Sequence, residues 1–358
     1  MQQDTKVKRV AVRAIDIGHS NTKYTLGRKD SGNGNAIKTA MFTSIAPRVA
    51  KTQTINTTGA QRSSASIIGV GDADYWVGPG AASQAGGSEP RFVNDDYCLS
   101  PKYHALMLGA LNEMAQEEGA GHELMIEQLV LGLPLTTYVR HADALRSRMT
   151  GEHRIGRAGE STLRQVTIKD VSVLVQPHGA LMNLGTSRFA ALSGLNLVVD
   201  AGGGTLDWFM TRGTEPNWAK SGAHAKGMLH CGLAVADGIK KSWRNQFEVM
   251  DTIDLALRTN AESFTVSGHD YPLAAHRADV EAVLAESVNS LLESTGDLDG
   301  VSRILFVGGG ARLFHDYMKR AFPRLQRVMT IDSDPVFANL LGFHIAGEYQ
   351  LRRAVAAR

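Results

Sequence analysis

Cysteine and aromatic residues are scarce in this chain of 358 residues, and its net charge is only +2. Its two cysteines, Cys98 and Cys231, lie far apart and in no metal-ligand spacing, which favours two free thiols over a disulfide framework. Lys and Arg total 38 against 36 Asp and Glu, a balance that gives no signal for nucleic acid. No apolar run approaches the ~20 residues that span a bilayer, and no signal-peptide pattern opens the chain. We therefore expect a cytoplasmic protein without a membrane partner.

Glycine, by contrast, is abundant, with 37 residues, and much of it directly follows apolar, strand-like runs. Hydrophobic residues make up 43% of the chain, whose length suits two domains better than one core. Apolar periodicity predicts strands and helices in alternation, which indicates an α/β protein. Strands are expected at 10–17, 129–135, 164–169, 171–175 and 303–307, and helices at 101–118, 136–150, 180–192, 232–245, 249–258 and 273–295.

One pattern occurs twice, about half a chain apart. Residues 15–20 read Ile-Asp-Ile-Gly-His-Ser, and residues 199–205 read Val-Asp-Ala-Gly-Gly-Gly-Thr. Each is the end of a strand, an Asp, a glycine-bearing turn and a hydroxyl residue, and a further strand follows each. The repetition predicts two similar domains that face one another, each presenting one hairpin turn to a shared cleft.

Such turns are suited to phosphate. Successive backbone N–H groups form a concave anion site, and glycine lets the backbone approach a ligand closely. Ser20, Lys23 and Thr205 add side-chain donors. The carboxylates of Asp16 and Asp200 would repel phosphate unless a hard cation such as Mg²⁺ lay between them. Taken alone, the turn after Asp16 is equally consistent with a tight β-turn. The turn after Asp200 is more specific, because three consecutive glycines after a buried strand need a reason, and the matched pair favours a nucleotide.

A third glycine cluster follows the strand at 303–307. Gly308, Gly309 and Gly310 precede Ala311, where a helix is expected to begin. Glycine at such a strand end lets a ribose or a flat ring pack against the backbone, and the helix N-terminus favours phosphate. Alone, this segment would be only a tight strand-to-helix turn. With the other two turns it completes the elements of a nucleotide site.

The order of these motifs resembles that of the actin/Hsp70/sugar-kinase ATPase superfamily. Its five motifs correspond to residues 14–23, 175–182, 197–208, 304–313 and 334–342, in that order over nearly the whole chain. The chain is most similar to the plasmid-segregation actins of the ParM/StbA type, with the ParM-like proteins of the PRTRC system as the nearest subgroup. The resemblance implies an actin-like, ribonuclease H-like duplicated fold with a nucleotide cleft between two lobes.

The resemblance also implies domain limits. Residues 1–195 and 336–358 would form domain I, with a small subdomain inserted at roughly 37–100. Residues 196–335 would form domain II, with a subdomain inserted at roughly 220–295.

Site roles follow from the same resemblance. Asp16 and Asp200 would hold Mg²⁺ with its waters and act in catalysis. The phosphates would contact Gly18, Ser20, Asn21, Lys23, Gly202, Gly203, Gly204 and Thr205, while Gly308, Gly309, Gly310 and Ala311 would flank the adenosine. Either Gln176 or His178 would orient the attacking water; we favour Gln176, because a carboxamide orients water without being a strong base. Asp237 would approach the ribose or lie on a helix surface.

The implied activity is hydrolysis of ATP (or GTP) coupled to polymerisation into filaments. In segregation systems a separate DNA-bound adaptor protein captures the filament, so we expect self-association and an adaptor, without direct nucleic-acid binding. Two alternatives stay open: a small-molecule kinase, and a regulatory ATPase that forms no filament. ATP-dependent light scattering separates the filament hypothesis from both.

Overall fold

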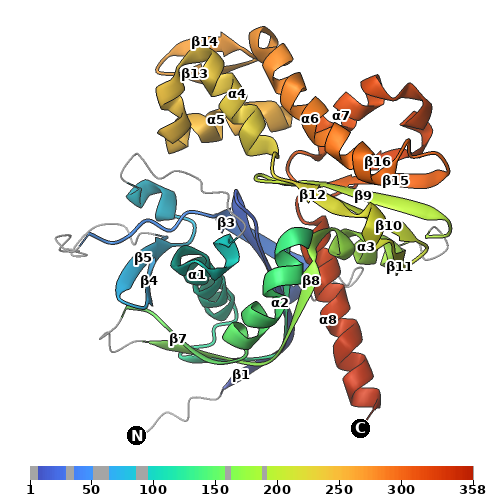
Figure 1. Ribbon diagram of the computed structural model, residues 1–358. Helices are drawn as coiled ribbons and strands as arrows, with labels where there is room; N and C mark the ends of the chain where they lie inside the picture. The colour runs from blue at the N-terminus through green and yellow to red at the C-terminus, as the bar shows by residue number, and fades with distance from the viewer. Residues whose placement is uncertain are drawn as a thin grey trace, which may run out of the picture.

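Two β-sheets organise the molecule (Figure 1). The computed structural model describes residues 7–29, 36–50, 64–85, 96–157, 163–187 and 192–357. Sheet I takes its strands from the first half of the chain and sheet II from the second half. In these ranges, no helix has both the length and the apolar character needed to cross a membrane.

Sheet I has six strands in the order β3-β2-β1-β6-β8-β7. Its centre is parallel, because β1 pairs with β6 and β6 pairs with β8 in parallel, whereas β2, β3 and β7 are antiparallel additions. The prediction of two strands at 164–169 and 171–175 is wrong: polar Lys169 and Asp170 lie within one continuous strand. The strands are β1 (Lys8–Ile17), β2 (Asn21–Arg28), β3 (Ile37–Thr43), β6 (Glu123–Leu133), β7 (Gly151–Ile155) and β8 (Arg164–Val175).

Sheet II repeats the core of this arrangement. The path runs β11-β10-β9-β15-β16, and β12 pairs with β10 beside β11. The hairpin β9–β10 is antiparallel, while β9–β15 and β15–β16 are parallel, as in β1–β2, β1–β6 and β6–β8. The strands are β9 (Leu195–Ala201), β10 (Leu206–Arg212), β11 (Glu215–Pro216), β12 (Gly222–His224), β15 (Val301–Val307) and β16 (Met329–Ile331).

The two hairpins share one register. Asp16 pairs with Lys23, and 184 positions later Asp200 pairs with Asp207. The last pair before each turn is also equivalent, because the pair formed by residues 17 and 22 matches that of residues 201 and 206. The repeated sequence pattern therefore folds as a repeated structure, and the fold is the predicted two-lobed actin-like α/β fold.

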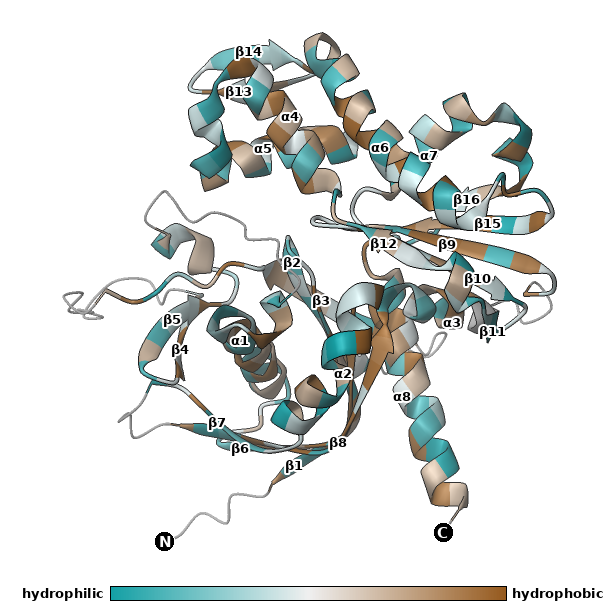
Figure 2. Cartoon of the chain, viewed as in Figure 1, coloured by the Kyte–Doolittle hydropathy of each residue, from teal (hydrophilic) through white to brown (hydrophobic). Residues whose placement is uncertain are grey.

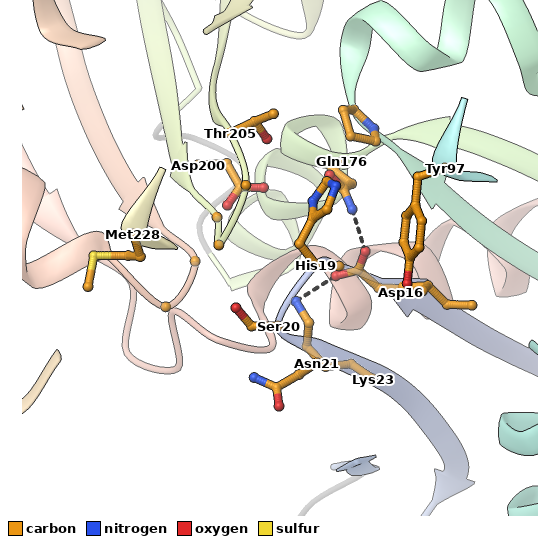
Figure 3. Close-up of a pocket in the computed structure, with 18 of the residues that line it drawn as sticks. Asp16, His19, Ser20, Asn21, Lys23, Tyr97, Gln176, Asp200, Thr205 and Met228 are labelled. Carbon is orange, nitrogen blue, oxygen red and sulfur yellow. Dashed lines mark hydrogen bonds and ion pairs between the residues drawn. The ribbon is translucent and has the colours of Figure 1, made fainter. Parts of the chain in front are cut away.

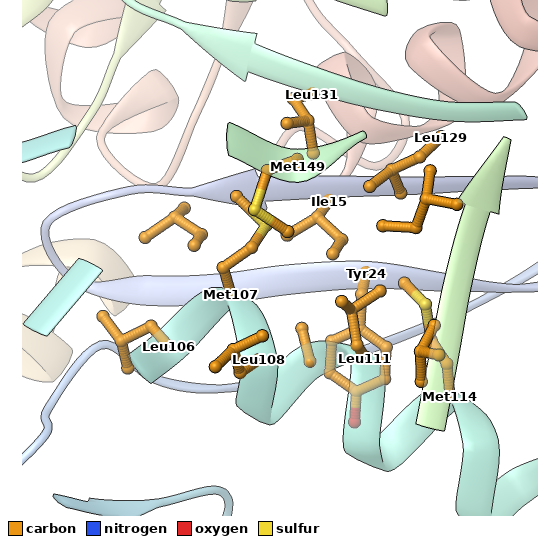
Figure 4. Close-up of a cluster of buried hydrophobic side chains, with 14 of the residues drawn as sticks. Ile15, Tyr24, Leu106, Met107, Leu108, Leu111, Met114, Leu129, Leu131 and Met149 are labelled. Atoms are coloured by element: carbon orange, nitrogen blue, oxygen red, sulfur yellow. The ribbon is translucent and has the colours of Figure 1, made fainter. Parts of the chain in front are cut away.

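Helices cover the outer face of each sheet. Sheet I packs against α1 (Pro101–Glu117) and α2 (Leu135–Met149), whose apolar side chains join those of β1, β2 and β6 in one core (Figure 4). Helix α1 begins where predicted, because Ser100 accepts a hydrogen bond from the N–H of Tyr103 and Pro101 needs no donor partner there. Sheet II packs against α4 (Met228–Ile239), α5 (Phe247–Thr259), α6 (Arg277–Thr295) and α7 (Ala311–Ala321).

Two helices cross between the sheets, and each covers the sheet of the other half. Helix α3 (Gln176–Ser187) follows β8 of sheet I but packs against sheet II through Ala180 and Leu181. Helix α8 (Ala338–Ala356) follows sheet II and returns to sheet I, where its apolar first half packs (Figure 2). The helices approach so closely that a Cβ on Gly342 would lie 1.7 Å from the carbonyl oxygen of Gly179.

Two short hairpins form small sheets of their own, apart from the two main sheets. The hairpin β4 (Ser66–Val70) and β5 (Ala73–Val77) belongs to the segment predicted as a small subdomain, of which residues 51–63 and 86–95 lie outside the described residues. The hairpin β13 (Ser263–Val266) and β14 (His269–Pro272) lies among α4, α5 and α6. The domain limits themselves stay predictions. Short 3-10 helices are η1 (Ala81–Gln84), η2 (Tyr97–Leu99), η4 (Trp218–Lys220), η5 (Lys241–Asn245), η6 (Leu273–His276) and η7 (Pro323–Val328).

The helix predicted at 232–245 begins earlier and ends at Ile239, after which η5 continues as a tighter turn. Likewise, residues 273–276 of the helix predicted at 273–295 form η6, and α6 itself starts at Arg277.

Candidate functional site

A pocket lies between the two equivalent turns, and both halves of the chain line it (Figure 3). Sheet I contributes the turn after β1, and sheet II contributes the turn after β9 and the end of β15. Of the predicted site residues, the pocket brings together Asp16, Gly18, Ser20, Asn21, Lys23, Gln176, Asp200, Gly202, Gly203, Gly204, Thr205, Gly308 and Gly309.

The turns are closed by the same hydrogen bond. The N–H of Gly18 donates to the carbonyl of Asn21 over 3.0 Å, and that of Gly202 donates to the carbonyl of Thr205 over 3.0 Å. The turns also touch one another across the pocket. A Cβ on Gly203 would lie 2.3 Å from the hydroxyl oxygen of Ser20, so side chains on the first turn require glycine on the second.

The peptide planes of the second turn are fixed by helix α4. The carbonyls of residues 202–204 accept hydrogen bonds of 2.8–3.1 Å from the N–H groups of residues 227–229 at the start of α4. Because a trans peptide points its N–H opposite to its carbonyl, the N–H groups of Gly203 and Gly204 point away from α4. This orientation leaves donors for an anion on the pocket side of the turn.

Asp16 is buried and held by two partners from its own lobe. Gln176, the first residue of α3, donates from Nε2 to Oδ1 over 2.6 Å, and Lys23 Nζ lies 2.6 Å from Oδ2. Lys23 also donates to the carbonyl of Val336 over 3.2 Å. Burial lowers the pKa of Lys23, but the charges of Asp16 and Asp200 outweigh it and raise the pKa above its ordinary value. Lys23 is therefore a fixed cation between the carboxylates.

Asp200 is the equivalent carboxylate of the second lobe. Asn339, near the start of α8, donates from Nδ2 to Oδ2 over 2.6 Å. Burial raises the pKa of Asp200 to about 6, although Lys23 opposes the shift and Asp16 adds to it. Asn339 Oδ1 is buried and has no hydrogen-bond partner among the described residues. Two carboxylates and an orphaned carbonyl oxygen are the hard donors that Mg²⁺ with its waters accepts, so the residues fit that ion.

Asp207 forms a hydrogen bond to the other lobe and another to the hydroxyl of Thr205, which fixes the direction of that hydroxyl. Its Oδ1 accepts from the N–H of Leu135, at the start of α2, over 3.3 Å. Its Oδ2 accepts from the Thr205 hydroxyl over 2.5 Å. Burial and the charge of Asp200 raise the pKa of Asp207 to about 7. Since the hydroxyl proton of Thr205 is already donated, that oxygen faces a ligand as an acceptor, which suits a cation better than a phosphate.

Several predicted site residues lie outside the pocket lining. His178 packs against Phe209, with ring centroids 5.6 Å apart, on the face of α3 that covers sheet II. Asp237 pairs with Arg244 at 3.0 Å, as a helix-surface carboxylate does. Gly310 and Ala311 are part of the turn into α7, where the Gly310 N–H donates to the carbonyl of Ala201.

Other lining residues had no signal in the sequence pattern. Asp254 and Arg258 form an ion pair of 2.8 Å one turn apart on α5, and Arg258 lies beside Gly309. Met228 packs against Gly310. The i,i+4 spacing of Asp254 and Arg258 is visible in the sequence, but it does not distinguish a pocket pair from an ordinary ion pair on an exposed helix face.

Comparisons with known proteins agree with the fold. Residues 14–179 match the family model "Actin like proteins N terminal domain", and residues 198–320 match "Archaeal actin homologue MreB-like, C-terminal". No curated protein matches the chain in sequence.

Solved structures match over almost the full chain. The archaeal actin homologue Ta0583, in complex with ADP, is 21% identical with a TM-score of 0.67, over 95% of this chain and 100% of that one. A ParM from Clostridium botulinum, solved as a 15-stranded filament, is 17% identical with a TM-score of 0.71, over 94% and 99%. The actin-like protein Alp7A is 14% identical with a TM-score of 0.72, over 98% of each chain.

Proposed function

The chain belongs to the actin-like superfamily, and on that premise we propose that it binds ATP with Mg²⁺ between its lobes, hydrolyses it, and polymerises in the ATP-bound state. The observation that carries this proposal is the pair of hairpin turns. They have the same register, come from different sheets, and line one pocket together with Asp16 and Asp200. The ADP complex of Ta0583 supports the choice of ligand.

The geometry suggests how the ligand lies. The nucleoside would rest beside Gly308, Gly309 and Arg258, where the backbone has no side chain in the way. Its phosphate chain would run between the two turns toward Lys23, which neutralises phosphate charge. Asp16 and Asp200 would hold Mg²⁺ through its waters, and the ion would supply charge neutralisation for the phosphates.

Hydrolysis needs a water oriented toward the terminal phosphorus. Gln176 begins α3 at the pocket, directly after β8, and its carboxamide can position such a water. The water oxygen forms the new bond to phosphorus as the bond to the ADP oxygen breaks, which leaves ADP and inorganic phosphate. Asp16 keeps the Gln176 side chain in the pocket through their hydrogen bond of 2.6 Å.

Polymerisation would follow from lobe closure. A head-to-tail contact that does not close into a ring builds an open helical filament. The C. botulinum ParM filament supports self-association as the output of this fold. We extend the proposal to segregation of a plasmid or mobile element in the cytoplasm, with a DNA-bound adaptor protein as the second partner.

Light scattering and electron microscopy test the assembly claim. We expect scattering to rise on addition of ATP and Mg²⁺, to persist with a non-hydrolysable analogue, and to stay low with ADP. Asp200→Asn should abolish the rise, because it removes a pocket carboxylate. Asp237→Asn is the matched control, since Asp237 pairs with Arg244 outside the pocket lining, and it should assemble as the wild type does.

The alternatives predict other results. A chain that releases phosphate but stays monomeric with the analogue would be a regulatory ATPase, and phosphate transfer to a metabolite would identify a kinase. Either result would overturn the filament proposal while leaving the nucleotide site intact.

A further inference from the structure

His19 lies within the first turn, between Gly18 and Ser20, but its side chain reaches across to the second. A Cβ on Gly204 would lie 2.5 Å from His19 Nδ1, so the imidazole occupies the space that any other residue at 204 would need. The ring stacks on Tyr97 with centroids 5.2 Å apart and planes inclined by 22°. His19 is therefore oriented by contacts with η2 on one side and with the opposite lobe on the other.

The far nitrogen of this ring has no partner in the parts of the chain that the structure describes. His19 Nε2 is buried from solvent and makes no hydrogen bond there. An unpaired buried polar atom is unfavourable, and a ligand could offset that cost by supplying the missing partner. Burial, with a smaller contribution from His230, lowers the pKa of His19 to about 4. At neutral pH the ring is uncharged and carries a single N–H.

The position of the ring indicates which part of a ligand it would meet. Figure 3 shows His19 with Gln176 and Tyr97 on one side of the pocket and Met228 on the other. Met228 packs against Gly310, on the side where the nucleoside is proposed to lie. A nucleotide that spans the pocket therefore brings the end of its phosphate chain to His19 and Gln176.

We propose that His19 binds the terminal phosphate of a nucleoside triphosphate through Nε2, and thereby makes the pocket distinguish triphosphate from diphosphate. The inference rests on the proposed nucleotide site and adds a specificity residue to it. A diphosphate ends before reaching Nε2, so it leaves that atom unpaired. Because the His19 ring also contacts Gly204, a triphosphate bound to Nε2 would influence the positions of both turns, one from each lobe.

Titration calorimetry with two ligands tests this assignment. We expect His19→Ala to weaken binding of a non-hydrolysable ATP analogue with Mg²⁺ by about tenfold, the loss of one hydrogen bond to a charged group. Binding of ADP should stay within about twofold, which is under 0.5 kcal/mol. His19→Gln should recover most of the loss, because its amide also offers an N–H donor.

A spectroscopic readout separates binding from a structural effect. In nitrogen-15 spectra of the wild type, the ring signal missing from His19→Gln should move with the analogue but not with ADP. Equal weakening of both ligands, or a ring signal that ignores the analogue, would overturn the inference. If the wild type bound neither nucleotide, the proposed function itself would fail, so the two failures are distinct.

Discussion

Two carboxamides hold the two carboxylates of the pocket. Gln176 donates to Asp16 and Asn339 donates to Asp200, each over 2.6 Å. Each carboxamide lies at the beginning of one of the two crossing helices, α3 and α8. Any change in the angle between these helices therefore moves a carboxylate partner, which links the pocket to the relative position of the lobes.

The roles of Gln176 and His178 can be separated by mutation. Gln176→Ala should slow steady-state ATP hydrolysis at least about tenfold, because the water loses its orienting group. Binding of the nucleotide should change little, since Gln176 is not among the proposed phosphate donors. Phosphate release and nucleotide affinity should be measured in parallel.

His178→Ala is the matched control, two residues along the same helix. Its ring packs against Phe209 outside the pocket lining, so hydrolysis should stay near the wild-type rate. Slow hydrolysis in His178→Ala together with normal hydrolysis in Gln176→Ala would reverse the assignment.

His344 provides a test of pH dependence away from the pocket. It is buried in α8, and its Nδ1 shares a hydrogen bond of 2.9 Å with the hydroxyl of Thr25. Burial lowers the pKa of His344 to about 4, with Arg13 and Arg28 adding to the shift and Glu348 opposing it. The folded protein therefore holds this ring uncharged.

Because the folded pKa is depressed, the unfolded chain binds the proton more tightly between pH ~6.5 and ~4. The free energy of unfolding should fall as the pH drops through that window, by up to about 3 kcal/mol from this group. The raised pKa values of Asp200 and Asp207 make the protein more stable as the pH falls, which opposes the effect of His344. The informative quantity is therefore the difference in unfolding free energy between wild type and His344→Gln at each pH. Denaturant unfolding of wild type and His344→Gln should diverge below neutrality, with the wild type losing stability relative to the variant as the pH falls. Parallel curves would show that the pKa of His344 is the same in the folded protein and in the unfolded chain.

The sequence could identify residues whose spacing repeats, and not those that meet only in three dimensions. Asp16, Lys23 and Asp200 follow from the repeated strand-turn-strand pattern. His19 and Tyr97 line the same pocket, but their contact depends on how η2 folds back on the first turn. Arg258 reaches the pocket from α5, and no local sequence pattern encodes the orientation of that helix.

At the scale of elements, hairpin register was the most predictable feature. The same residue types at a spacing of 184 positions gave two turns with one hydrogen-bond pattern. The family resemblance already implied that the last helix returns to the first lobe. The packing of α3 against sheet II was not predictable, because its apolar face suits either sheet. The prediction of two strands separated at residue 170 was wrong because a continuous strand can carry exposed polar side chains, here those of Lys169 and Asp170.

The crossing of α3 and α8 depends on glycine. A methyl group on Gly342 would meet the carbonyl of Gly179 at 1.7 Å, and backbone cannot yield as a side chain can. We expect Gly342→Ala to destabilise the protein by about 3 kcal/mol and to lower its apparent melting temperature.

Gly232→Ala on α4 is the control for that substitution. Its nearest neighbour would be the flexible end of Met250 at 3.2 Å, and alanine favours helix by about 1 kcal/mol over glycine. The control should melt near the wild-type temperature or above it. A wild-type melting temperature for Gly342→Ala would mean that the helices are further apart than described.

At the scale of the molecule, the two sheets are joined by an exchange of helices and by contacts across the pocket. The hydrogen bond from Leu135 to Asp207 and the contact of His19 with Gly204 both cross from one half to the other. A ligand gripped by both turns would add to these contacts, and a shorter ligand would add fewer. This difference is the physical basis for a switch between assembling and non-assembling states.

Hydrogen exchange read by mass spectrometry tests the central claim most directly. With ATP and Mg²⁺, amide exchange should slow together in peptides that cover residues 17–21 and 201–205, one from each half of the chain. Peptides that cover residues 140–149 of α2, none of which lines the pocket, should be unchanged. Slowing in one turn alone, or in neither at saturating ATP, would contradict a triphosphate site shared by the two turns.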